Sequence, residues 1–392
     1  MGNTETVWRR MLRTDVGRRE WVDFVKGTAI ILIVAYHTTL FLTSIGFDAA
    51  GIGRLKVVLE LFPMPAFFLI TGVFHNRVGQ WSFADVWKRR LRQYLYLYLL
   101  WSVIRFVLYR LAPNVRSDGA GSTASDPLAL LGILIWPISS YWFIYALFIF
   151  TLALWLFRKA PQWVLISIAL VLSVLSSSGI LNAHNVGINR MTEYLIFFTL
   201  GAYFSRKIFD LFDGMRLWRA IALVIGFAGF AAVVTLFPVL QRIPGSAFVG
   251  QLLAIATGFA LAYYLVHLVF LKWVVYVGLR TLNIYLVHLF VIALLVAPLA
   301  FVPVLDELPG RGLLLIGVLT TLVILLSILI TRYLTRFSWL FVYPFTGRKK
   351  GRARAAHNME ADATAERAAR APEGTGPEQD PPQSPTGKVG TA

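Results

Sequence analysis

Apolar runs of about twenty residues recur along most of the chain, and they constrain its fold more than any other feature. An α-helix needs about 20 apolar residues to cross the hydrocarbon core of a bilayer. The chain is 57% hydrophobic and only 15% charged, which is too apolar for a water-soluble domain. We therefore predict an all-α, polytopic integral membrane protein with about ten transmembrane helices, near residues 24–45, 54–76, 93–112, 138–157, 163–181, 191–205, 217–237, 247–271, 281–301 and 312–337.

The basic residues are distributed unevenly around these helices, and this distribution predicts the topology. When the chain is threaded alternately through the membrane, most of its 37 lysines and arginines fall on one side. Cytoplasmic loops carry such an excess, so we predict that both termini are cytoplasmic. The net charge of +17 then reflects topology, and we expect membrane lipids rather than nucleic acid as partners.

Composition divides the chain into three parts. Residues 1–22 form a basic N-terminal segment that we expect in the cytoplasm, and residues 23–340 hold the predicted helices. Residues 347–392 are rich in Ala, Pro, Gly and charge and lack apolar runs that could build a core, so we predict a disordered cytoplasmic tail. The chain has no cysteine, which excludes disulfides and a cysteine nucleophile.

The first predicted span contains ionisable residues that a helix in lipid would not ordinarily carry. Asp23 and Lys26 lie at its cytoplasmic end, and His37 lies well inside it. Such groups are costly in a membrane and usually functional. A separation of eleven residues turns a helix by three turns plus about 20° and raises it by about 16–17 Å. Lys26 and His37 therefore share one face but cannot hydrogen-bond to each other.

This arrangement suits a long anionic ligand that enters from the cytoplasm and places its reactive end inside the membrane. A coenzyme A thioester has that shape, with phosphates at one end and the thioester at the other. Lys26 alone is also typical of a snorkelling anchor at the membrane surface, and that alternative stays open. The sequence has no GxSxG or HExxH motif, so His37, with His288 second, is the best candidate for acid–base chemistry in the membrane.

Five segments carry a resemblance to a known family. Lys26-x10-His37 lies within WVDFVKGTAIILIVAYH, and four segments follow it in chain order: FPMPAFFLITGVF (62–74), YWFIYALF (141–148), FFTLGAYFSRK (197–207) and NIYLVH (283–288). Together they resemble the motifs of the acyltransferase type 3 family of integral membrane acyltransferases, and specifically of its sugar O-acetylase branch. The resemblance covers about residues 20–340. Its first motif is the most specific.

The resemblance implies transfer of an acyl group, usually acetyl, from cytosolic acyl-CoA to a hydroxyl of a cell-envelope glycan or glycolipid. The donor substrate would be acetyl-CoA or another acyl-CoA, and no metal is expected. A bacterial plasma membrane is the expected location. In this scheme His37 is the general base that takes the proton of the acceptor hydroxyl. A transient acyl-histidine remains an alternative.

Other polar residues lie at depths that call for an explanation. Glu60 and Arg105 approach the level of His37 from the second and third spans, so they either pair with each other or line an acceptor cavity. Trp142 and Tyr285 are candidate support residues for the same cavity, although Trp142 also fits an interfacial aromatic belt. His288, one turn after Tyr285, is either a support residue or a structural hydrogen-bonding group.

Three further expectations concern the ends of the spans. Arg77 follows the second span at its cytoplasmic end, where it could assist Lys26 with phosphates or simply reflect topology. Pro63 and Pro65 should break or kink the second span. Glu193, at the outer start of the sixth span, is expected to be solvated.

A transporter or flippase of a glycan or lipid precursor is the alternative function. Such proteins also combine about ten spans with buried charges, and many carry internal repeats with paired broken helices. We find no convincing repeat between the halves of this chain. The presence of both Lys26 and His37 also argues against a membrane protein that keeps the fold without catalysis.

Overall fold

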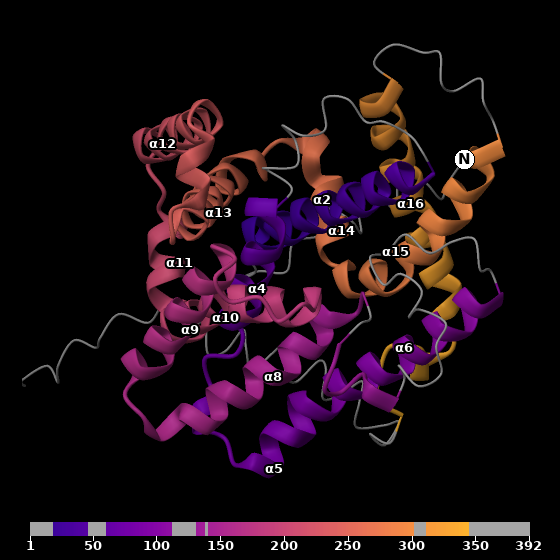
Figure 1. The fold of residues 1–392 in the computed structure, drawn as a ribbon, viewed down its shortest axis with the longest axis horizontal. Helices are drawn as coiled ribbons and strands as arrows, with labels where there is room; N and C mark the ends of the chain where they lie inside the picture. The colour runs from indigo at the N-terminus through magenta and orange to yellow at the C-terminus, as the bar shows by residue number, and fades with distance from the viewer. Residues whose placement is uncertain (1–18, 46–59, 112–130, 138–139, 302–310, 345–392) are drawn as a thin grey trace, which may run out of the picture. The chain divides into compact units, whose positions relative to one another are not determined.

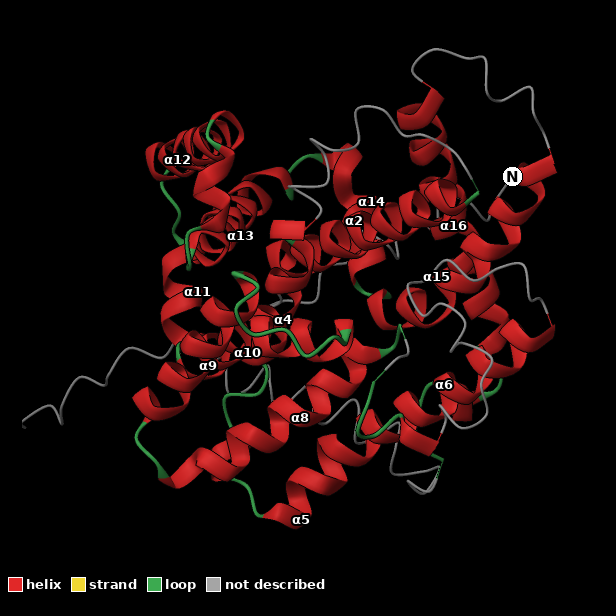
Figure 2. Cartoon of the chain, viewed as in Figure 1, coloured by secondary structure: helices red, strands yellow, loops and turns green. Residues whose placement is uncertain are grey.

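The computed structural model describes residues 19–45, 60–111, 131–137, 140–301 and 311–344. All regular structure in these ranges is helical, and they contain no strand (Figure 2). The predicted all-α class is therefore confirmed. The tail at 347–392 and nearly all of the N-terminal segment lie outside the described residues, so the predictions made for them stay predictions.

A helix corresponds to each of the predicted apolar runs (Figure 1). The long helices are α2 (Glu20–Ser44), α4 (Pro63–Val73), α6 (Arg92–Leu111), α8 (Trp142–Leu156), α9 (Gln162–Ser177), α10 (Val186–Tyr203), α12 (Leu217–Leu236), α13 (Ser246–Leu265), α15 (Thr281–Val296) and α16 (Arg311–Leu334). Short helices join them: α5 (Phe83–Val86), α11 (Ser205–Asp213) and α14 (Lys272–Gly278).

The membrane class rests on the length and apolarity of these helices. Among the described residues, six helical segments are long and apolar enough to cross a membrane: 20–44, 142–159, 217–236, 246–265, 281–299 and 313–334. Two shorter apolar helices, 162–177 and 269–278, accompany them. The protein is therefore an integral membrane protein, and the number of ten spans stays a prediction.

The helix α2 lies at the centre of the described bundle and packs against α4, α13, α14, α15 and α16 (Figure 1). Its contact with α14 is backbone to backbone. A Cβ atom at Gly27 would collide with the carbonyl oxygen of Val274, and one at Gly278 would collide with that of Asp23. Only glycine permits this approach, so the Lys26 region is held firmly against α14.

A second close crossing joins α4 to α10. A Cβ atom at Gly72 would collide with the carbonyl oxygen of Phe198, and one at Gly201 would collide with that of Leu69. Both glycines lie in segments that carry the family resemblance. Because both glycines lie where α4 crosses α10, we infer that these two segments are needed for the close packing of the two helices.

The start of the second span is interrupted as its prolines predict. Residues 60–61 are helical, Phe62 forms a bend, and α4 begins at Pro63. Proline is accepted in the first turn of a helix because that turn needs no N–H donor. The bend leaves Glu60 just outside α4, at the end of the bundle away from Lys26.

Interhelical polar contacts bring together the helix ends that alternate threading assigns to one side. Arg19 Nε donates to Asp213 Oδ2 at 2.6 Å, which ties the start of α2 to the end of α11. Lys272, at the start of α14, pairs with Glu20. We call this end of the bundle the Lys26 end. Its assignment to the cytoplasm remains a prediction.

Candidate active site

Lys26 is fixed by a carboxylate on its own helix. Its Nζ lies 2.6 Å from Asp23 Oδ1, one turn earlier on α2. Asp23 is 3% exposed, whereas the Lys26 side chain is 23% exposed. The buried carboxylate therefore orients an ammonium group that is still accessible at the Lys26 end.

His37 lies on the same continuous helix and is partly exposed. Its Nδ1 lies 2.9 Å from the carbonyl oxygen of Ile33. Because a carbonyl only accepts, Nδ1 must carry the hydrogen of this bond, and the neutral ring then holds its lone pair on Nε2. A general base needs such a nitrogen. The geometry of His37 is compatible with the predicted role.

His288 on α15 contacts His37 directly. The two ring centroids are 5.1 Å apart and the rings are inclined at 71°. His288 is fully buried, and its Nδ1 donates to the carbonyl oxygen of Tyr285 at 2.7 Å. Its Nε2 has no hydrogen-bond partner within the described part of the chain. The sequence identified both histidines but did not predict their contact, because nothing in the spacing relates α2 to α15.

Two tyrosines connect α15 to the start of α8. The Tyr285 hydroxyl donates to the carbonyl oxygen of Ser140 at 2.8 Å, and the Tyr141 hydroxyl donates to that of Leu286 at 2.8 Å. This reciprocal pair fixes the part of α15 that carries His288. Two more segments of the family resemblance, 141–148 and 283–288, are therefore in contact.

Trp142 belongs to an aromatic cluster inside the bundle. Its ring centroid lies 6.1 Å from that of Phe68 and 6.3 Å from that of Tyr194. These contacts position the side chain within the packing between α4, α8 and α10. A role in substrate binding stays a prediction.

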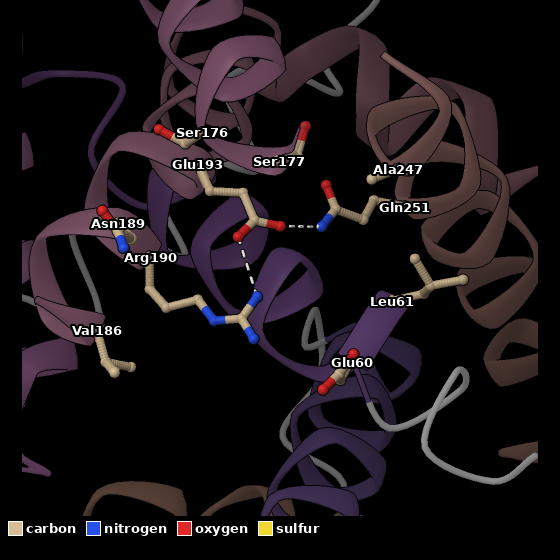
Figure 3. A pocket seen from close by; sticks show the side chains of 10 residues that line it. All are labelled: Glu60, Leu61, Ser176, Ser177, Val186, Asn189, Arg190, Glu193, Ala247 and Gln251. Atoms are coloured by element: carbon tan, nitrogen blue, oxygen red, sulfur yellow. Dashed lines mark hydrogen bonds and ion pairs between the residues drawn. The ribbon is translucent and has the colours of Figure 1, made fainter. Parts of the chain in front are cut away.

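A polar cavity of about 380 Å³ opens between helix ends away from the Lys26 end, and Figure 3 shows the side chains that line it. Its walls come from the segment before α4, the end of α9 and the first turns of α10 and α13. The lining residues are Glu60, Leu61, Ser176, Ser177, Val186, Asn189, Arg190, Glu193, Ala247 and Gln251. We call this cavity the outer pocket.

Glu193 is the central hydrogen-bonding group of the outer pocket. Its Oε2 accepts from Arg190 Nη1 at 3.0 Å, and its Oε1 accepts from Gln251 Nε2 at 2.6 Å. Figure 3 shows the carboxylate between these two partners. Glu193 is only 7% exposed, so the expectation that it is solvated is wrong. A buried carboxylate is retained here because a charged donor and an amide satisfy it.

Sequence reasoning missed Arg190 and Gln251 as members of this site. One signal was present, because residues 190 and 193 are three apart and lie on the same face of a helix. Gln251 gave no signal, since it is a single neutral side chain in an apolar helix and 58 residues separate it from Glu193.

The outer pocket is electrostatically connected to α2. Tyr36 lies within range of the charges of both Glu60 and Arg190. Its ring centroid is 5.6 Å from that of His37, in an edge-to-face contact. Tyr36 thus interacts with charges of the pocket lining and also contacts His37.

Glu60 belongs to the lining of the outer pocket, and Arg105 does not. Glu60 lines the outer pocket together with Arg190, and its role towards an acceptor stays a prediction. Arg105 is buried on α6, at 4% exposure, and does not belong to the described lining.

In the turn after α4, the His75 side chain is already committed to other contacts. His75 is buried, with Nδ1 2.6 Å from the carbonyl oxygen of Thr71 and Nε2 3.0 Å from the Tyr94 hydroxyl. Both ring nitrogens are thus occupied. Arg77 is exposed, and its contact with a donor substrate stays a prediction. Within the described residues, no group of three or more His, Asp or Glu side chains could hold a metal ion.

Comparison with known proteins assigns the family. The family model described as an acyltransferase domain, of the acyltransferase type 3 family, matches residues 19–346. The chain belongs to this family. The match includes α2 with Lys26 and His37, all ten long helices, and the outer pocket of this acyltransferase. No curated protein and no solved structure matches the chain.

Proposed function

We propose that this acyltransferase moves an acetyl group from cytosolic acetyl-CoA to a hydroxyl of a cell-envelope glycan or glycolipid, in a bacterial plasma membrane with both termini cytoplasmic. The observation that carries the proposal is the arrangement of α2. One continuous helix presents a fixed ammonium, Lys26, at one end, and a partly exposed imidazole with its lone pair on Nε2, His37, about three turns further on.

The donor would enter from the Lys26 end. Its phosphates would contact Lys26, which Asp23 orients, and Arg77 is the proposed second cation. The pantetheine arm would then run along α2 towards His37. The predicted rise of about 16–17 Å between Lys26 and His37 suits a ligand whose phosphates and thioester are well separated.

The reaction is a direct transfer. The acceptor oxygen attacks the thioester carbonyl while His37 Nε2 takes the hydroxyl proton. The C–S bond then breaks, and the imidazolium returns the proton to the departing thiolate, which leaves as coenzyme A. A new ester bond is formed, and His37 ends the cycle neutral.

His288 is proposed as the positioning residue for His37. It contacts the His37 ring from α15 while its own Nδ1 is held by Tyr285. A second charge on this fully buried ring would be costly, so His288 would stay neutral and fix the orientation of His37.

The test is the transfer rate of His37→Gln. Purified protein is incubated with acetyl-CoA labelled in the acetyl group and with an envelope glycan and glycolipid extract. General base catalysis contributes about 10²- to 10⁴-fold, so we expect His37→Gln to transfer at least about 100-fold more slowly while it still binds acetyl-CoA.

His267→Gln is the matched control. His267 is exposed near the end of α13, so the same substitution there should leave the rate unchanged. If His37→Gln transferred acetyl within a few-fold of the parent rate, the proposed general base would be wrong. Membership of the acyltransferase family favours this function over that of a transporter or flippase.

A further inference from the structure

The outer pocket has a lining rich in hydrogen-bond acceptors. Among the described residues, two carboxylates, Glu60 and Glu193, share it with one guanidinium, that of Arg190. Asn189, Ser176 and Ser177 add an amide and two hydroxyls. A ligand that fits such a lining must bring several hydrogen-bond donors and need not bring a charge.

Gln251 is the lining residue whose orientation is the most restricted. It is 2% exposed, and its Nε2 is committed to Glu193. That bond fixes the orientation of the amide, because a carboxylate only accepts. The other amide atom, Oε1, is buried and has no hydrogen-bond partner in the described part of the chain.

An unsatisfied buried acceptor beside a cavity indicates a missing donor. Leaving such an atom unpaired is costly, and buried polar atoms in native proteins are nearly always paired. A hydroxyl group brought by a ligand would satisfy Oε1. The fixed amide would then distinguish a ligand with a hydroxyl at that position from one without it.

We propose that the outer pocket binds a neutral, polyhydroxylated sugar unit and that Gln251, oriented by Glu193, recognises one of its hydroxyls. This inference rests on the proposed function, for which the pocket serves as the acceptor subsite, with Tyr36, the neighbour of His37, within range of its charges. Arg190 serves the lining by holding Glu193, and the described lining carries one more carboxylate than guanidinium, a balance that disfavours an acidic sugar.

Binding is tested separately from catalysis. His37→Gln protein in nanodiscs is titrated with methyl glycosides of glucose, galactose and mannose and with methyl glucuronoside, and binding is followed by ligand-observed NMR. We expect at least one neutral glycoside to bind, and the glucuronoside to bind about tenfold more weakly or worse. Preferred binding of the glucuronoside would overturn the proposal.

Two substitutions locate the binding in the pocket. Gln251→Leu removes the amide at similar size and should weaken binding of the neutral glycoside by about fivefold, as expected for one hydrogen bond. Glu60→Gln should reduce the discrimination against the glucuronoside. Ile225→Ala, on the exposed face of α12, is the control and should change neither. Unchanged affinities in both pocket variants would overturn the proposal.

A further arm distinguishes a glycolipid acceptor from a soluble glycan. Dodecyl glycosides present the same sugar from the bilayer, whereas methyl glycosides present it from water. If Gln251→Leu weakens binding of both forms alike, the pocket recognises the sugar whatever its source. Weakening of neither form would contradict the proposal.

The failure of this inference differs from the failure of the proposed function. Acetyl transfer that needs His37 but ignores Gln251 would remove the pocket and keep the acyltransferase chemistry. Pocket-dependent sugar binding without His37-dependent transfer would keep the pocket and remove the general base.

Discussion

At the Lys26 end, α2 is held by ion pairs and by backbone contact with α14, whereas the outer pocket, beyond Tyr36, is a polar cavity of about 380 Å³. The charged side chains in the two regions make different contacts. Those at the Lys26 end join one helix to another, and Lys26 is oriented by a carboxylate of its own helix. The charged side chains of the outer pocket line its cavity.

This difference suggests a division of tasks along one bundle. In the proposed function, the tightly packed end would hold Lys26 in place for the phosphates of the donor. The open polar end would receive the sugar of the acceptor. Two experiments test the Lys26 end, and the one with the larger expected effect comes first.

The largest effect is expected where α2 meets α14. Gly27→Val adds atoms where even a Cβ collides with the Val274 carbonyl, so the two backbones must separate. We expect a loss of stability of about 3 kcal/mol, at the upper end of the usual cost of overpacking. Thermal unfolding of the purified protein measures it.

Gly226→Val is the matched control for this substitution. A Cβ atom at Gly226, on α12, would meet nothing within 4 Å, so its melting temperature should stay close to that of the parent. Equal melting temperatures for Gly27→Val and Gly226→Val would show that the Lys26 end is not tightly packed.

A smaller effect is expected at Lys26. Lys26→Ala should weaken acetyl-CoA binding by about tenfold, the contribution of a hydrogen bond to a charged group. Lys26→Arg should largely preserve binding, because either cation can contact a phosphate. Equilibrium binding of acetyl-CoA to nanodisc-embedded protein measures both.

Lys272→Ala is the control for charge at the same end. Lys272 is ion-paired with Glu20 and so joins α14 to α2. Its substitution should leave acetyl-CoA affinity within about twofold, a change below that of a single hydrogen bond. If both alanine variants bound acetyl-CoA equally, Lys26 would be structural too.

The helices were predictable because apolar runs and helix geometry are local properties. The regular rise of a helix also fixed the separation of Lys26 and His37. The prolines predicted the bend at Phe62 for the same reason, since their effect is exerted within one turn.

Contacts between distant segments were not predictable from one sequence. The His37–His288 contact joins α2 to α15, and the bond from Gln251 to Glu193 joins α13 to α10. Glu193 was predicted to be solvated because a carboxylate near a helix start usually faces water. Its burial depends on two partners that only the folded bundle brings to it.

The central claim is that the donor and the acceptor approach His37 from opposite ends of the bundle. Sealed proteoliposomes test it directly. Labelled acetyl-CoA is enclosed in the lumen, and the neutral methyl glycoside that binds best is supplied outside. In a second preparation both substrates are supplied outside only, and detergent is then added to open the vesicles.

The account predicts acetylated glycoside when the substrates are on opposite sides of the membrane. It predicts almost none when both are outside, and recovery of product after detergent. Equal rates with both substrates on one side of intact vesicles would contradict the claim that each substrate has its own end of the bundle.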